Sequence, residues 1–224
     1  MALLWQRFIL CIFIFSINTA FSKNQISLLA HQKYVSEYLL KKPKQKGLLI
    51  YHSLGSGKTI LSLNYAERTK GNVYVLMPHF LKSTWEIQME TFGIQEPSRY
   101  KFISFKEIEE NFEDFNFEKS TVIIDESHRI VSGILSEDEK ISKSYQHLYV
   151  SLFKAKRILA LTGTPIYNQV SDLSYLINLV SGKDHLPFDN NLFRLDYTKV
   201  DHQTSWARGY LLESKVVDLS FPII

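Results

Sequence analysis

A glycine-rich segment ending in lysine and threonine has the residue types that bind a phosphate chain. Residues 54–59 read LGSGKT and lie between an expected strand and an expected helix. Glycines let successive backbone N–H groups point at one anion, and the N-terminal end of the following helix adds positive potential. Lys58 can reach the β- and γ-phosphates, and the Thr59 hydroxyl can bind Mg²⁺. The residues expected to hold a nucleotide here are Gly55, Ser56, Gly57, Lys58 and Thr59.

This loop departs from the full phosphate-loop pattern at one position. His52 stands where the first glycine is expected. The alternative is a flexible glycine turn before a helix. The Lys-Thr pair in a strand-to-helix context favours the phosphate loop.

A second segment places two carboxylates at the end of an apolar run. Residues 123–128 read IIDESH. An acid at the end of a buried parallel strand can hold Mg²⁺, so Asp125 is expected to share the metal with Thr59. Glu126 can orient and deprotonate an attacking water, and His128 can sense the γ-phosphate. For this segment alone, charged residues that merely end a strand would be the preferred interpretation, but its order after the glycine loop favours catalysis.

A third segment, residues 161–165, reads LTGTP and follows another apolar strand. Its hydroxyls and small residues suit a loop near the γ-phosphate. By itself it would be an ordinary turn. Its weight comes from its order after the other two segments.

The elements that must position these segments alternate along the chain. Short β-branched runs followed by helical periods are typical of a parallel sheet flanked by helices. The expected strands are residues 47–51, 72–77, 100–105, 120–124 and 157–161. The expected helices are residues 59–69, 81–92, 106–112 and 168–180. The polar stretch 132–144 predicts an exposed loop or insertion, and the chain from Lys183 onward has no clear period.

Composition favours a folded protein. The chain has 224 residues, of which 45% are hydrophobic, 22% charged and 13% aromatic, which argues against disorder. The net charge of +3 permits contact with nucleic acid without requiring it. Cys11 is the single cysteine, which excludes an intrachain disulfide and a thiolate metal cluster.

Residues 1–22 resemble a secretory signal. Arg7 precedes the apolar run 8–15, and small residues lie at 20–22. A bilayer span needs about 20 apolar residues, so a permanent anchor and a stable membrane partner are not expected. The alternatives are a buried helix or a misassigned start. We expect an intracellular location (nucleus, cytoplasm or viral factory), with export or membrane targeting left open.

The three segments together carry a family resemblance. Residues 55–59, 125–128 and 161–168 resemble motifs I, II and III of superfamily-two helicases. The third, with Arg157 upstream, is most similar to the Swi/Snf-type ATPases and their viral relatives, including poxvirus-like nucleoside triphosphatases. The resemblance covers roughly residues 28 to 182.

The resemblance implies further contacts. Residues 75–78, followed by Lys82, Ser83 and Trp85, are similar to motif Ia, whose loop touches the nucleic-acid backbone. A core position for Trp85 is an equally open alternative. Gln32 matches the glutamine that reads adenine upstream of the phosphate loop.

The family also implies a fold and an activity. We expect an α/β fold, namely a three-layer RecA-like P-loop NTPase lobe with a mainly parallel sheet flanked by helices, over residues 23–182. Its cofactors would be ATP and Mg²⁺, and its partner nucleic acid, expected to be double-stranded DNA. Residues 183–224 would be a tail or the start of a second lobe. The resemblance places the arginine finger on that second lobe, so we expect either that the lobe is another polypeptide or that the chain is a fragment.

Three functions remain open on these grounds. The first is a DNA-dependent helicase or translocase ATPase. The second is a half-motor or ATP-binding interaction module with little turnover of its own. The third, a P-loop kinase or transport ATPase, would require the second and third segments to lie far from Lys58.

Overall fold

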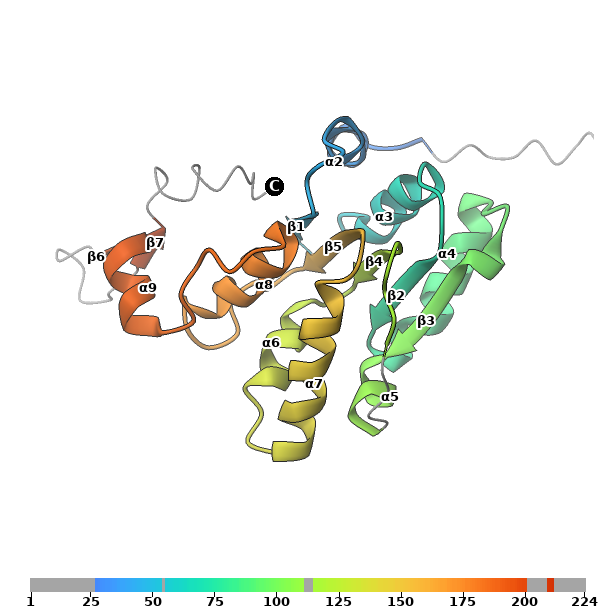
Figure 1. Cartoon of the computed structure of the whole chain (residues 1–224). Helices are drawn as coiled ribbons and strands as arrows, with labels where there is room; N and C mark the ends of the chain where they lie inside the picture. The colour runs from blue at the N-terminus through green and yellow to red at the C-terminus, as the bar shows by residue number, and fades with distance from the viewer. Residues whose placement is uncertain (1–26, 54, 111–114, 201–208, 212–224) are drawn as a thin grey trace, which may run out of the picture.

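The computed structural model describes residues 27–53, 55–110, 115–200 and 209–211. Its main sheet has five parallel strands in the order β1-β5-β4-β2-β3 (Figure 1). The strands are β1 (Gly47–Tyr51), β2 (Val73–Met77), β3 (Tyr100–Ser104), β4 (Thr121–Ile124) and β5 (Arg157–Thr162). All five predicted strands are present, with ends that differ from the prediction by one residue at most.

Helices fill the connections between the strands, as parallel pairing requires. They are α2 (Ala30–Lys41), α3 (Lys58–Glu67), α4 (Lys82–Phe92), α5 (Phe105–Glu110), α6 (His128–Ile134), α7 (Glu139–Leu152), α8 (Asp172–Ser181) and α9 (Asn190–Tyr197). Short 3-10 turns η1 (His79–Leu81) and η2 (Pro97–Arg99) precede α4 and β3, and β6 (Thr198–Val200) pairs antiparallel with β7 (Gly209–Leu211).

Two hydrophobic clusters lie on opposite faces of the sheet because successive strand residues point to opposite sides. Ile50 and Ile123 belong to the cluster beneath α2, α3 and α4. Leu49 and Ile124 belong to the cluster covered by α5, α6, α7 and α8, of which α6 and α7 lie side by side in Figure 1. Strands buried on both faces read as continuous apolar runs. The arrangement confirms the predicted three-layer α/β fold.

The prediction of a loop at residues 132–144 is wrong. The last turn of α6 and the first part of α7 lie in this segment, joined by the short connection 135–138. Asp138 caps α7, accepting hydrogen bonds from the backbone N–H groups of Lys140 (2.9 Å) and Ile141 (3.1 Å). Buried Tyr145 and Leu148 then follow at helical spacing. The polar residues lie on the solvent side of a helix whose apolar stripe begins late in the segment.

Two further helices have no counterpart in the predicted elements, namely α2 and α9. Leu186 and Phe193, which follow α8, are buried in the same cluster as Leu176 of that helix. The domain limits at residues 22 and 182 stay predictions, and the signal-like residues 1–22 lie outside the described part of the chain. None of the helices in the described part is long and apolar enough to cross a membrane.

Candidate active site

The three motif segments meet at one edge of the sheet. They follow the carboxyl ends of β1, β4 and β5, and β5 lies between the other two strands. The backbone N–H of His52 donates to the carbonyl of Thr162 (3.2 Å), and that of Ser127 donates to the carbonyl of Leu161 (2.8 Å). The spatial separation that a P-loop kinase or transport ATPase would need is therefore not present.

The glycine loop turns through two left-handed residues. Gly55 has φ 76° and Gly57 has φ 79°, a region that favours glycine. Gly57 is also the residue before α3, and its carbonyl accepts the hydrogen bond of Leu61 N–H (3.1 Å). A Cβ atom at Gly57 would lie 2.1 Å from Nε2 of Gln32, whereas the space around Gly55 is open. A side chain at position 57 would therefore strain the backbone and displace the Gln32 amide.

Gln32 braces this loop from α2. Its Nε2 donates to the carbonyls of Ser56 (3.2 Å) and Gly57 (3.3 Å), and its Oε1 accepts the backbone N–H of Leu29 (3.0 Å). The side chain is 5% exposed. Both ends of the amide are therefore engaged with backbone groups, and the adenine contact expected from the resemblance stays a prediction.

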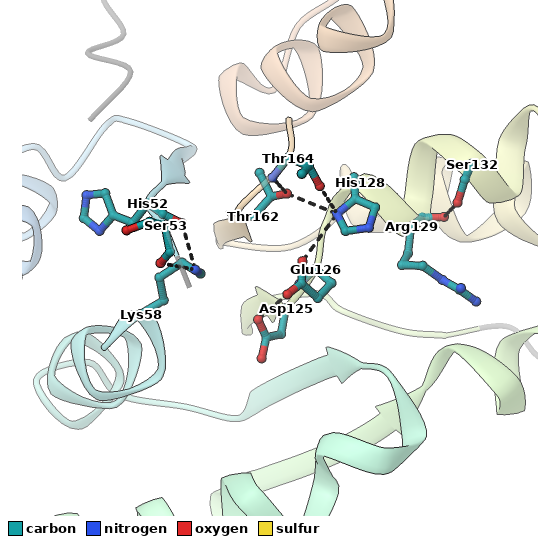
Figure 2. Close-up of polar contacts among 10 residues, drawn as sticks. All are labelled: His52, Ser53, Lys58, Asp125, Glu126, His128, Arg129, Ser132, Thr162 and Thr164. Atoms are coloured by element: carbon teal, nitrogen blue, oxygen red, sulfur yellow. Dashed lines mark hydrogen bonds and ion pairs between the residues drawn. The ribbon is translucent and has the colours of Figure 1, made fainter. Parts of the chain in front are cut away.

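Lys58 lies at the first position of α3 and is 8% exposed. Its Nζ donates to the carbonyls of His52 (2.9 Å) and Ser53 (3.1 Å), as Figure 2 shows. The ammonium group thus lies across the start of its own loop. Thr59, the expected metal ligand, is the next residue of the helix and is partly buried.

A histidine pair flanks the loop. The rings of His31 and His52 pack edge to face with centroids 5.3 Å apart, and Nε2 of His31 lies 3.1 Å from the carbonyl oxygen of Ser56. Burial lowers the pKa of His52, and the charges of His31 and Lys58 lower it further. Sequence reasoning did not single out His31, and its position beside Gln32 is the one local signal that could have identified it.

Asp125 is a buried carboxylate held by two donors. It is 7% exposed. Its Oδ2 accepts the indole Nε1–H of Trp85 (2.9 Å), and its Oδ1 accepts the backbone N–H of Glu126 (3.1 Å). Burial raises the pKa of this carboxyl group and Glu126 adds to that effect, while the Trp85 hydrogen bond and the positive charge of Lys58 oppose it. Lys58 is therefore close enough to act on Asp125 electrostatically.

His128 joins the second and third segments (Figure 2). Its Nδ1 lies 3.4 Å from Oε2 of Glu126, 3.1 Å from Oγ1 of Thr162 and 3.3 Å from Oγ1 of Thr164. The backbone of Glu126 is left-handed, with φ 53°, an unusual conformation that marks functional sites. Burial lowers the pKa of His128 and Arg129 adds to this, whereas Glu126 opposes it.

Comparison with known proteins assigns the chain to a family. The family model of the SNF2-related domain matches residues 65–185, more than half of the chain. The chain belongs to the SNF2-related domain family. This match begins after the glycine-rich loop, so the assignment and the loop geometry are separate observations.

Viral proteins are among the relatives of this SNF2-related chain. It is 30% identical over 174 residues to a putative ATP-dependent RNA helicase of Acanthamoeba polyphaga mimivirus, covering 76% of the chain and 36% of that protein. It is 30% identical over 198 residues to the termination factor NPH-I homolog of African swine fever virus (isolate Pig/Kenya/KEN-50/1950), covering 79% of the chain and 28% of that protein. The chain thus spans about a third of the length of these relatives.

A solved structure shares the fold. The Sulfolobus solfataricus SWI2/SNF2 ATPase core in complex with dsDNA superposes with a TM-score of 0.58 at 18% identity, covering 77% of this chain and 39% of that one. At this identity the likeness supports the architecture alone. It confirms the predicted RecA-like fold class.

A groove of about 840 Å³ extends from the active-site edge of the SNF2-related domain. Ser53, Glu126 and His128 line one part of it. The remaining walls come from the segment after β2, from α5, from the start of α6 and from the loop after β5, namely Pro78, His79, Phe80, Phe105, Lys106, Glu109, Arg129, Gly163 and Thr164. Phe80 is 75% exposed. The groove therefore joins Glu126 to an exposed surface just before α4.

Trp85 does not contribute to that surface. It is 1% exposed and packs in the cluster beneath α3 and α4. Of the two alternatives that the sequence left open, the core position is correct and a direct nucleic-acid contact by Trp85 is excluded. Lys82 and Ser83, on the first turn of α4, are exposed.

Proposed function

We propose that this SNF2-related chain binds ATP with Mg²⁺ and hydrolyses it to drive movement along nucleic acid, with double-stranded DNA as the expected track. One observation carries the proposal. Lys58 at the start of α3 and the pair Asp125 and Glu126 after β4 lie at one edge of the sheet, and the positive charge of Lys58 lowers the pKa of Asp125 against the larger effect of burial. A cation, a metal ligand and a base at one edge are the groups that phosphoryl transfer needs.

The residues present fit a bound nucleotide. The hydroxyl of Ser56 and Nδ1 of His52 are buried without a hydrogen-bond partner among the described atoms, and the space beside Gly55 is open. Buried polar groups are nearly always paired, so an unpaired set beside a glycine loop supports an anion site. The described residues contain no cluster of three or more His, Cys, Asp or Glu side chains suited to a metal. Mg²⁺ is compatible with this, because it is often held by one carboxylate together with phosphates and waters.

Each side chain then has a distinct role. Lys58 would exchange the carbonyls of His52 and Ser53 for phosphate oxygens. Asp125 and Thr59 would hold Mg²⁺, which supplies charge neutralisation of the phosphates when bound. Glu126 would accept a proton from the attacking water.

His128 would report on the γ-phosphate. Its Nδ1 already contacts Glu126 on one side and the Thr162 and Thr164 hydroxyls on the other. A change at the carboxylate can therefore reach the loop after β5 through one ring. We assign His128 the role of linking the catalytic base to that loop.

The groove supports the nucleic-acid part of the proposal. It runs from Glu126 and His128 to Lys106 and the exposed Phe80. The solved relative of the same fold binds double-stranded DNA, whereas the mimivirus relative is described as an RNA helicase. We infer a duplex DNA track along this groove, with backbone contacts that are largely independent of sequence.

Substituting Lys58→Ala tests the ATP site. The variant should lose nucleotide binding, because the one ammonium group that the described loop presents to phosphates is removed. Binding of a fluorescent ATP analogue to the purified chain, titrated with MgCl₂ present, measures this. Lys143→Ala, which removes an exposed lysine of α7 paired with Glu139, is the control and should bind as the unchanged protein does. An unchanged affinity for Lys58→Ala would contradict the assignment.

A second candidate is an ATP-binding half-motor that docks on a partner and turns over little by itself. The observation that favours it is that the described residues build one lobe around one five-stranded parallel sheet, whereas the family resemblance places the arginine finger on a second lobe. An arginine finger contributes about 10³ to 10⁵ in rate in the GTPases that use one. ATPase assays with and without duplex DNA separate the candidates, since strong DNA-stimulated turnover by this chain would exclude the half-motor.

A further inference from the structure

Trp85 and Asp125 form a buried polar contact that core packing does not require. The indole Nε1–H donates to Oδ2 of Asp125 at 2.9 Å, with the two residues 1% and 7% exposed. Indole has a single polar atom, and here that atom points at a carboxylate. Phenylalanine would fill much of the same apolar space. The hydrogen bond is what tryptophan adds at this position.

The hydrogen bond from Trp85 leaves lone pairs of the Asp125 carboxylate available for a further ligand. A carboxylate has about four lone-pair directions on its two oxygens. One oxygen accepts from Trp85 and the other from the backbone N–H of Glu126 (3.1 Å). Both oxygens are therefore restrained, while each keeps capacity for a further ligand. The Glu126 donor belongs to the backbone, so Trp85 is the side chain that sets the orientation of the group.

Trp85 is itself held in place by the elements around the site. Its ring meets that of Phe102 on β3 edge to face, with centroids 6.5 Å apart. The helix that carries it, α4, packs against α3, whose second residue is Thr59. The Trp85 indole is therefore held in the same helical layer as Thr59, the other expected metal ligand.

We propose that Trp85 is a positioning residue for Mg²⁺ binding, holding the Asp125 carboxylate in its ligating orientation before the metal and nucleotide arrive. The inference rests on the proposed ATP site and adds a residue to it. Hydrogen-bond partners that orient metal ligands commonly contribute about 10- to 100-fold to metal affinity. Trp85 acts through Asp125 and touches neither nucleotide nor metal.

The variant Trp85→Phe tests this in the full chain. Affinity for a fluorescent ATP analogue is measured in excess MgCl₂ and again in excess EDTA, and the ratio reports the contribution of the metal. We expect the ratio to fall about tenfold in Trp85→Phe with the EDTA affinity unchanged, because the carboxylate loses its orienting donor. A ratio equal to that of the unchanged protein would overturn the proposal.

Tyr100→Phe is the matched control. Tyr100 is 6% exposed and its hydroxyl donates to Oε1 of Glu67 at 2.9 Å, so this change also deletes an aromatic hydrogen bond to a carboxylate. It lies at the amino end of β3, away from the site. Its ratio should stay unchanged, and an equal fall in both variants would overturn the positioning role. If the unchanged protein binds no nucleotide, or binds it without a metal effect, the proposed function itself fails.

A second measurement keeps the proposal testable if Trp85→Phe does not fold. The chain has three tryptophans, so Trp5→Phe and Trp206→Phe variants assign the Trp85 indole N–H signal in ¹⁵N NMR spectra. Asp125→Ala should shift that signal upfield, and MgCl₂ added to the ATP-bound protein should also move it. A signal that responds to neither change would overturn the inference.

Discussion

At the scale of single residues, the loop depends most on Gly57. Its left-handed backbone and the nearby amide of Gln32 both disfavour a side chain there. Gly55 shares the backbone conformation but faces open space. Substitutions at the two glycines therefore distinguish two effects. A change at Gly55 introduces backbone strain alone, whereas a change at Gly57 adds a steric clash with Gln32.

We predict that Gly57→Ala weakens ATP binding and thermal stability more than Gly55→Ala does. Both changes carry the cost of alanine at positive φ, about 1 kcal/mol, and only the first also displaces Gln32. Titration with a fluorescent ATP analogue and thermal unfolding measure the two effects. Adding Gln32→Ala to Gly57→Ala should recover part of the loss in stability. Equal losses for the two glycine variants would show that Gln32 does not brace the loop.

Two histidines should make stability depend on pH. Burial lowers the pKa of His52 and of His128 in the folded chain. The native state therefore binds fewer protons than the unfolded chain just below the ordinary histidine pKa of about 6.5. Their contribution to stability is complete above that value and is lost as the pH falls through the lowered pKa values.

We expect the free energy of unfolding, measured with urea, to decrease between about pH 7 and about pH 5. A variant with His52→Asn and His128→Asn should show a smaller decrease over the same range. Asp125 has a raised pKa and acts in the opposite direction, so the comparison between the two proteins isolates the histidines. An identical slope in both proteins would contradict the assignment.

At the scale of elements, α7 shows how a helix can be hidden in a polar sequence. Asp138→Ala removes its cap and should lower the free energy of unfolding by about 1 kcal/mol. Urea unfolding followed by circular dichroism measures this. Glu137→Ala, which deletes an exposed acidic side chain one residue earlier, is the control and should cost much less. A loss of the same size at both positions would point to charge rather than capping.

At the scale of the whole molecule, the groove continues from Ser53, Glu126 and His128 of the candidate active site. Lys106 lines the groove on α5 and forms an i,i+4 ion pair with Glu110 (3.5 Å). On α7, Lys143 forms the equivalent ion pair with Glu139 (2.6 Å), but Lys143 does not line this groove. The two lysines are equally exposed, at 66% each. They differ in their position relative to the proposed DNA track.

Lys106→Ala should therefore weaken binding to duplex DNA of any sequence and reduce the slope of log affinity against log salt by about one. Lys143→Ala should leave both quantities unchanged. Fluorescence anisotropy of labelled duplex DNA at several salt concentrations measures the two variants in parallel. If Lys143→Ala has the larger effect, the track lies elsewhere on the molecule.

Much of the fold could be predicted locally. Buried parallel strands are continuous apolar runs, so β1 to β5 were visible from residue types alone, and the glycine loop is identifiable because few backbones tolerate its conformation. The α7 helix was missed because its polar first half outweighs an apolar stripe that begins with the partly buried Ile141 and continues with Tyr145. Prediction from local sequence succeeds for elements whose residue types are all contained in one short segment.

The site itself needed tertiary structure. The strand order places β5 between β1 and β4 although β5 is last among the five strands of this sheet in sequence, and that order brings three separate loops to one edge. The sequence named Lys58, Asp125, Glu126 and His128, because their types and context suggest phosphate chemistry. It could not show that Trp85 donates to Asp125 across 40 residues, because such a contact depends on how α4 packs against the sheet and leaves no trace in local periodicity.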